Sequence, residues 1–450
     1  MESKTCKTLL VMLVIAIFPI MILEPNLGNT GNSVVLDQPV VEVFRGGKTY
    51  AFMFSWDDGG DDLNFSFFED ELSFKHTTFA VTSRIWKRQL WGLDMMFRGH
   101  DIQSHSREHL HHATLNESYL HFLLSQSIWD IEQVYGFTPI LFAYPYGSQD
   151  ADSRRLVLEY FKLGRGIYYE TDSNRGTWPI ENLGNCLHSF PGIDGVVGNS
   201  FERLVPSFNN MVESSNGNHR AYKCYGHSKW FTTGERQAFF EQLREIAFRN
   251  DTWYTSWGDA VAYQIEKDHV RIESFSYNNK SLSFRTNIDS SSRFGVPLTY
   301  RIEIPVFWNN IYVLDGNKKS DSYCILEEGN RTFLLLDSIP QNQTIQVGRG
   351  DIDDFEGPKI QGLRTLITDE GVAFIADITD KDGFVKDVNF TIRGNGEEFK
   401  YYQVVNPIFW SNSTFGRVIF NLASGSYSFS VTACDSSGNI ESVTRSFCIC

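Results

Sequence analysis

Two adjacent carboxylates are the first residues in this sequence whose position suggests chemistry. Asp57 and Asp58 follow the apolar segment 50–56 and are followed by Gly59. Neighbouring like charges raise each other's proton affinity, and a cation between them or a shared proton would relieve that cost. An acidic turn is the simpler alternative, because the stretch alone carries little information.

A second group of polar residues is rich in histidine. Five of the eleven His residues lie between positions 100 and 112, and His105 and His109 are four residues apart. On a helical turn this spacing directs both imidazoles from one face, as metal ligands require. We expect His111 and His112 at the surface and His100 inside the protein. A solvated polar loop is the alternative for the whole group.

Two further segments lie near predicted strand ends. Residues 142–147 read Phe-Ala-Tyr-Pro-Tyr-Gly, an aromatic strand that continues into a Pro/Gly turn. His227 follows Tyr225-Gly226 further along the chain. Taken singly, the first segment is compatible with an ordinary strand-ending turn, and a lone histidine is more often structural than catalytic.

Strands and helices alternate in the part of the chain that contains these residues, from about residue 47 to residue 265. Apolar runs at 50–56, 77–82 and 140–144 predict strands. Helices with one apolar face are predicted after the capping boxes Thr114-x-x-Glu117 and Thr232-x-x-Glu235. This alternation indicates a parallel, barrel-like sheet in a single α/β domain.

After residue 268 the hydrophobic pattern changes to a period of two. Leu298, Tyr300 and Ile302 alternate with polar residues, and similar alternation recurs near residues 388–392 and 427–431. Such alternation predicts antiparallel strands. We place a β-sandwich domain at 268–349 and an immunoglobulin-like β-sandwich domain at 357–450, with an acidic hinge between them.

Together, the four segments resemble the polysaccharide deacetylase family, the NodB-like domain that is also grouped as carbohydrate esterase family four. The resemblance depends mainly on Asp57-Asp58-Gly59 and on His105-Ser106-x-x-His109, with the Pro-x-Gly turn and a late His in the expected order. It implies an α/β fold, a distorted (β/α) barrel over residues 45–267, followed by the two antiparallel sandwiches.

The resemblance also implies roles for single residues. The family's three ligands to a divalent cation, usually Zn2+, correspond here to Asp58, His105 and His109. Asp57 would be the general base that removes a proton from the attacking water. His227 would protonate the departing amine, and the backbone N–H of Tyr146 would stabilise the oxyanion.

The sequence departs from the family pattern in three ways, at two positions and in one motif. Ala143 occupies the place where many members have an Arg that steadies the base, so that another side chain must take this task or catalysis is weakened. Tyr225 replaces the usual Leu two residues before the final His. The family's motif with an Asp and a Trp is not securely found, and Asp172 is a candidate partner for the acid His227.

The favoured function is a metal-dependent hydrolase that removes N-acetyl groups from a cell-surface or extracellular polysaccharide. Its class would be hydrolases acting on carbon–nitrogen bonds other than peptide bonds. A non-catalytic glycan-binding or adhesion protein with a decayed barrel is one alternative, and Ala143 is its best support. An O-acetyl esterase or an amidase with the same metal site is another. Trp86 is among several tryptophans that could line a sugar groove.

The N-terminus and the net charge bear on location and partners. Lys4 and Lys7 precede an apolar run at 9–23, which predicts a signal peptide or an N-terminal membrane anchor within residues 1–30. The protein is then secreted or displayed at the cell surface. The formal net charge of −15 argues against a nucleic acid partner.

Two residue patterns are compatible with this location. N-glycosylation sequons begin at Asn64, Asn116, Asn250, Asn279, Asn330, Asn342, Asn389 and Asn412. Six cysteines follow Cys6, an even number that permits disulfides outside the cytoplasm. The pairs considered are Cys186 with Cys224, and Cys434 with Cys448 or Cys450. Free thiols are the alternative for each pair.

Overall fold

The computed structural model describes residues 36–60, 62–166, 187–189, 200–352, 356–402 and 413–449. The predicted signal or anchor at 1–30, with its apolar run 9–23, lies outside these residues. So do Asp172 and the cysteines at 186 and 450. Within the described ranges, no helix combines the length and the apolar character needed to cross a bilayer.

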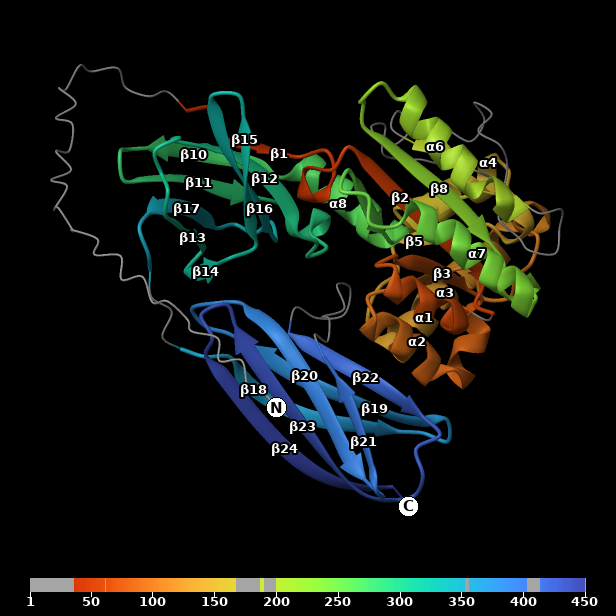
Figure 1. Ribbon diagram of the computed structural model, residues 1–450. Helices are drawn as coiled ribbons and strands as arrows, with labels where there is room; N and C mark the ends of the chain where they lie inside the picture. Colours follow the sequence, from red (N-terminus) through yellow and green to blue (C-terminus); the bar gives the residue numbers. More distant parts are fainter. Residues whose placement is uncertain are drawn as a thin grey trace, which may run out of the picture. The chain divides into compact units, whose positions relative to one another are not determined.

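A parallel sheet forms the first part of the fold (Figure 1). Its strands run in the order β6-β5-β4-β3-β2-β8-β7, and β9 also pairs with β2. Every pairing in this sheet is parallel. The strands are β2 (Tyr50–Asp58), β3 (His76–Ala80), β4 (Asp101–Ser104), β5 (Leu141–Ala143), β6 (Leu163–Arg165), β7 (Leu187–Ser189), β8 (Arg220–Gly226) and β9 (Thr252–Thr255).

Strand β2 is central because its side chains are buried along its whole length. A run of apolar residues without alternation is typical of a parallel strand that is covered on both faces. Its last residues are Asp57 and Asp58, and Asp58 pairs with Ala80 of β3. On the other side, Trp56 pairs with Gly226 of β8. The carboxyl ends of these strands therefore bring the polar segments together at one edge.

Helices follow most of the strands. They are α1 (Asp62–Glu71), α2 (Gln89–Phe97), α3 (Glu117–Tyr135), α4 (Ala151–Tyr160), α6 (Leu204–Ser214), α7 (Thr233–Ile246) and α8 (Trp257–His269). The capping box predicted at Thr232 and Glu235 is confirmed at the start of α7. The box predicted at Thr114 is wrong. Asn116 caps α3, because the Thr114 hydroxyl donates instead to the carbonyl of His111.

Two antiparallel sheets form the next part of the fold. One has the order β1-β12-β16-β15 and the other β10-β11-β17-β13-β14. The short strand β1 (Val40–Val41), which precedes the barrel in the chain, pairs with β12. The other strands are β10 (Arg271–Tyr277), β11 (Ser281–Asn287), β12 (Leu298–Ile304), β13 (Ile311–Asp315), β14 (Lys318–Ser320), β15 (Tyr323–Glu328), β16 (Arg331–Ser338) and β17 (Thr344–Arg349).

A second pair of antiparallel sheets follows, with the orders β18-β19-β22 and β21-β20-β23-β24. Their inward residues share one hydrophobic cluster, as a sandwich requires. The strands are β18 (Lys359–Ile367), β19 (Gly371–Thr379), β20 (Val385–Gly394), β21 (Glu397–Tyr401), β22 (Thr414–Phe420), β23 (Gly425–Asp435) and β24 (Ile440–Ile449). The predicted α/β domain with a parallel sheet, followed by antiparallel sandwiches, is confirmed.

The described cysteines make no disulfide with one another. Cys224 is a buried free thiol, and Cys434 and Cys448 are also free. The pairing of Cys434 with Cys448 is wrong for a reason of register, because Cys448 lies opposite Ser426 on β23, eight residues from Cys434. Because Cys224 and Cys434 are free, the predicted pairings of Cys186 with Cys224 and of Cys434 with Cys450 are also wrong.

Candidate active site

Three donor groups meet at the carboxyl edge of the parallel sheet. The Oδ1 atom of Asp58 lies 2.9 Å from Nε2 of His109 and 3.5 Å from Nε2 of His105. One donor atom from each side chain lies within 4.8 Å of the other two. Asp58 ends β2, and both imidazoles come from the segment after β4. One carboxylate and two imidazoles form a donor set typical of a divalent zinc site.

The orientation of His105 suits a metal ligand. Its Nδ1 lies 2.8 Å from the carbonyl oxygen of Ala143, so that Nδ1 carries the proton and Nε2 keeps its lone pair. Burial lowers the pKa of His105 to about 4, although the charge of Asp57 opposes this shift. The ring is therefore neutral near pH 7, which is the form that binds a metal.

The expected helical turn between His105 and His109 is wrong. Residues 105–111 belong to no helix. Ser106 has a φ of 64° and His109 a φ of 52°, and such left-handed residues interrupt a helix. Asp58 and Tyr146 also have positive φ, at 77° and 58°. Unfavourable backbone conformations of this kind concentrate at functional sites because the surrounding fold must hold them.

The carboxylate of Asp58 is ionised, and its two oxygens face different neighbours. Burial opposes ionisation, but contacts with His109 and Lys229 hold the pKa of Asp58 well below its usual range. The ammonium of Lys229 pairs with Oδ2. The buried Oδ1 faces the two imidazoles and makes no conventional hydrogen bond within the described residues. An orphaned anionic oxygen beside two imidazole Nε2 atoms fits a divalent cation.

Asp57 has a different environment. Its Oδ1 accepts a hydrogen bond from Nη2 of Arg165, and both side chains are buried. The guanidinium also lies between two rings, with Cζ 4.8 Å from the centroid of Phe79 and 4.7 Å from that of Tyr225. A planar cation that stacks and donates in this way fixes the direction of the carboxylate.

Arg165 was not found by the sequence analysis. It ends β6, and it is the register partner of Ala143 on β5. An arginine is therefore present beside the candidate base. It comes from β6, whereas the position at which many members of the resembled family carry the arginine is Ala143 on the neighbouring strand β5. The only signal in the sequence was an arginine at the end of a short apolar segment. Lys229 was also missed, although it stands two residues after His227.

The other predicted site residues lie in turns near this edge. Tyr146 belongs to the turn after β5, and its exposed ring lies 4.5 Å from the ring of His109 between centroids. His227 directly follows β8 and stacks on Trp230 at 3.9 Å. His227 thus lies just beyond the end of β8, the strand that pairs with the Asp57 strand β2, and its role as an acid remains a prediction.

The remaining histidines of the group divide between surface and interior. His100 is buried, as expected, and His111 is exposed. The expectation for His112 is wrong, because it is buried and its Nε2 lies 2.9 Å from the hydroxyl of Ser106. This contact holds the segment between the two candidate ligands. His112 is buried because the turn that begins at this residue directs its side chain into the protein.

A comparison with protein families agrees with this geometry. Residues 50–160 match the sequence profile described as Polysaccharide deacetylase. The matched segment contains the acidic pair and all three donor groups. Residues 50–160 are therefore similar to polysaccharide deacetylases.

Solved structures with similarity to this chain include several polysaccharide deacetylases. A putative polysaccharide deacetylase from Mycobacterium smegmatis is 15% identical, with 49% of this chain and 92% of that chain covered and a TM-score of 0.35. A probable polysaccharide deacetylase from Pseudomonas aeruginosa PAO1 is 15% identical, with 47% and 90% covered and a TM-score of 0.37. Peptidoglycan deacetylase PdaC from Bacillus subtilis is 14% identical, with 47% and 89% covered and a TM-score of 0.33. A search of curated proteins finds no match.

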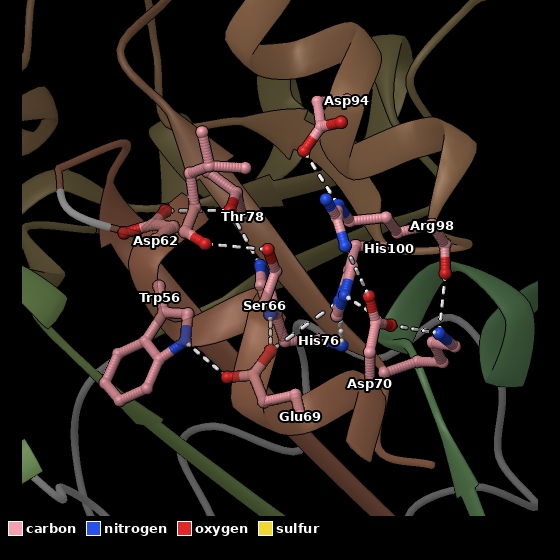
Figure 2. A network of polar contacts seen from close by, with 12 residues as sticks. Trp56, Asp62, Ser66, Glu69, Asp70, His76, Thr78, Asp94, Arg98 and His100 are labelled. Atoms are coloured by element: carbon pink, nitrogen blue, oxygen red, sulfur yellow. Dashed lines mark hydrogen bonds and ion pairs between the residues drawn. The ribbon is translucent and has the colours of Figure 1, made fainter. Parts of the chain in front are cut away.

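The α/β domain contains a second convergence of donor atoms, in which Glu69, His76 and His100 are all buried (Figure 2). Here the donor atoms already take part in hydrogen bonds. Nδ1 of His100 accepts from the backbone N–H of His76 at 3.2 Å, and Nδ1 of His76 contacts Oε2 of Glu69. Glu69 also accepts from the indole of Trp56 at 3.2 Å. This cluster is a polar network within the core of the α/β domain.

The network extends to the turn that carries Lys229. Nε2 of His76 lies 3.3 Å from the hydroxyl of Thr78, which donates to Oδ2 of Asp62 at 2.7 Å. The other oxygen of Asp62 accepts from the hydroxyl of Ser228. Asp62 therefore connects the turn after β8 to the interior of the domain.

We expect Asp62→Asn to change the pH dependence of stability. Burial raises the pKa of Asp62 from 3.8 to about 6. The folded protein therefore retains this proton to higher pH than the unfolded chain, and the wild type loses stability as pH rises from about 4 to about 6. The difference corresponds to about 3 kcal/mol.

Urea unfolding at several pH values between 4 and 7 measures this effect. The free energy of unfolding of Asp62→Asn, relative to the wild type, should rise by up to about 3 kcal/mol across that range. Thr138→Ala, a surface change outside the network, should follow the wild type. Parallel curves for Asp62→Asn and the wild type would contradict the assigned burial cost.

Proposed function

We propose that this chain is a metal-dependent deacetylase that hydrolyses N-acetyl groups of an extracellular or cell-surface polysaccharide. The observation that carries the proposal is that two adjacent carboxylates have different partners. Asp58 faces two imidazole Nε2 atoms, whereas Asp57 faces a guanidinium. Two neighbouring acids with different partners can perform two different tasks, one as a ligand and the other as a base.

Asp58, His105 and His109 would hold a divalent cation, for which Zn2+ is the first candidate from the donor types. When bound, such a cation polarises the acetyl carbonyl and makes the attacking water more acidic. The chain itself contributes the fixed ligand orientation. The hydrogen bond from His105 to the carbonyl of Ala143 and the contact of Lys229 with Asp58 both support that orientation.

The proton transfers are assigned to two residues at the ends of neighbouring strands, Asp57 at the end of β2 and His227 just after β8. Asp57 accepts a proton from water, with one carboxylate oxygen held by Arg165. His227 donates a proton to the leaving nitrogen, so that the carbon–nitrogen bond breaks to give acetate and a free amine. The backbone N–H of Tyr146 serves as a donor to the oxyanion. These assignments rest on the family resemblance together with the placement of the residues at one sheet edge.

Arg165 removes the main support for a decayed, non-catalytic barrel. That alternative depended on the missing arginine at Ala143, and the structure supplies an arginine to Asp57 from the next strand. An O-acetyl esterase would use the same groups, so acetate release from O-acetylated and N-acetylated substrates must be compared. The export signal expected within residues 1–30 supports the proposed location outside the cytoplasm.

The test measures bound metal and acetate release from N-acetylglucosamine oligomers. The wild type should bind about one divalent ion per chain at its candidate site. His105→Ala should lose the ion and more than about 10³-fold in kcat, because a Lewis acid contributes several kcal/mol to such reactions. His121→Ala, which removes a histidine on α3 outside the site, is the matched control. Equal acetate release by His105→Ala and the wild type would overturn the proposal.

A further inference from the structure

Exposed aromatic side chains are concentrated beside the metal centre. Eight aromatic residues of the described chain are exposed, and five of them lie in one connected group. This group, the aromatic track, consists of Tyr146, Tyr119, Phe122, Trp129 and Trp86. Apolar groups that cluster at the surface mark a binding site more often than exposed residues that are scattered singly.

The track begins at a candidate metal ligand. The ring of Tyr146 contacts the ring of His109 and stacks on His111, with 4.1 Å between the latter centroids and an interplanar angle of 13°. Glu108, the residue before His109, accepts a hydrogen bond from the hydroxyl of Tyr119 at 2.7 Å. The exposed surface therefore continues from the metal centre to the first turn of α3.

The track then follows one face of α3. Tyr119 and Phe122 are stacked with 6.0 Å between centroids, and the guanidinium of Arg107 lies 5.8 Å from the Phe122 ring. Phe122 and Trp129 are seven residues apart, which places them on the same helix face. From Tyr119 to Trp129 the helix advances about 15 Å.

Two tryptophans end the track. Trp86 is 48% exposed and Trp129 is 44% exposed, and their ring centroids are 5.6 Å apart. Asp130, which is buried, accepts from the indole N–H of Trp86 at 2.8 Å and from Arg107 at 3.2 Å. These bonds fix the Trp86 ring in place while leaving it open to solvent, which lowers the entropy cost of binding a ligand against it.

We propose that Trp86 and Trp129 form a distal subsite for sugar rings of the polysaccharide whose acetyl group reaches the metal centre. The inference rests on the proposed deacetylase function and extends it. The track places rings beside two charged side chains, Arg107 and Glu108. This composition matches a ligand whose rings have apolar C–H faces and hydroxyl edges. Continuity with the metal centre selects a polymeric substrate over an unrelated partner.

The test compares chain lengths with the double variant Trp86→Ala/Trp129→Ala. The probes are chitobiose and chitohexaose, which are two and six N-acetylglucosamine units long. The wild type should have a higher kcat/KM for chitohexaose than for chitobiose. The double variant should lose about tenfold in kcat/KM on chitohexaose, equivalent to about 1.4 kcal/mol. Its kcat/KM on chitobiose should equal that of the wild type. The control variant Phe307→Ala, which removes an exposed aromatic side chain in another domain, should have the wild-type kcat/KM on both chitobiose and chitohexaose.

A binding measurement separates this proposal from the deacetylase function. If the wild type releases acetate from neither probe, the proposed function fails, and calorimetric titration of chitohexaose into the metal-loaded protein tests the track by itself. Weaker binding by the double variant would then support the subsite. Equal binding and equal kcat/KM for both proteins would overturn it. The subsite proposal would also be overturned if the double variant lost the wild type's binding to phosphatidylcholine vesicles but bound chitohexaose equally well. The two tryptophans would then belong to a membrane-binding surface.

Discussion

Asp57→Asn is expected to lower kcat for acetate release by about 10²–10⁴-fold while the bound metal per chain stays that of the wild type. The reason is that Asp57 contacts Arg165 and not the histidines, so that its amide analogue removes a base but no ligand. Asp58→Asn is expected to act first on the metal. It neutralises the oxygen that faces His105 and His109.

Metal affinity and turnover must be measured on the same preparations. Loss of an outer hydrogen-bond partner of a ligand costs roughly 10–100-fold in affinity, and loss of the charged ligand Asp58 should cost more. Adding excess metal should restore part of the activity of Asp58→Asn and none of that of Asp57→Asn. Metal loss in both variants, or in neither, would contradict the proposed division of tasks.

The parallel sheet could be predicted from the sequence because its signals are local. The apolar run of β2 and the capping box at Thr232 and Glu235 each lie within a few consecutive residues, and both are confirmed. The start of α3 was misplaced because Thr114 and Asn116 are both good caps. The hydrogen bond from Thr114 to the carbonyl of His111 decides between them.

The candidate ligands could also be predicted, since their order and spacing along the chain carry the family resemblance. The conformation of the ligand segment could not, because positive φ at Ser106 and His109 leaves no trace in residue spacing. Contacts between distant segments were missed for a similar reason. Arg165 reaches Asp57 across 108 positions and Lys229 reaches Asp58 across 171. Only the strand order makes them neighbours.

Arg165→Ala is expected to lower kcat by about 10²-fold, the loss typical of a misplaced catalytic group. The change removes the cation that pairs with Asp57. Both side chains are almost fully buried, so water cannot replace the lost guanidinium. Breaking a buried pair of this kind destabilises a protein by about 3–5 kcal/mol. Thermal unfolding must therefore accompany the kinetics, so that lost turnover is measured on folded, metal-loaded protein.

The register between β5 and β6 offers a sharper experiment. Ala143 pairs with Arg165, and neighbouring strands are about 4.8 Å apart. The double variant Ala143→Arg/Arg165→Ala moves the guanidinium by one strand, to the position where many family members carry it, and the shortened side chain at 165 leaves room for it. We expect this variant to recover most of the kcat that Arg165→Ala loses.

Two single variants separate charge from geometry. Arg165→Lys keeps the positive charge but loses the planar donor that lies between Phe79 and Tyr225, and it should have an intermediate kcat. Ala143→Arg alone forces two guanidinium groups into one buried space and should unfold at a lower temperature than the wild type. If the double variant folds and binds metal but is no faster than Arg165→Ala, the arginine positions Asp57 only from β6. Wild-type kcat in Arg165→Ala would show that the base needs no arginine.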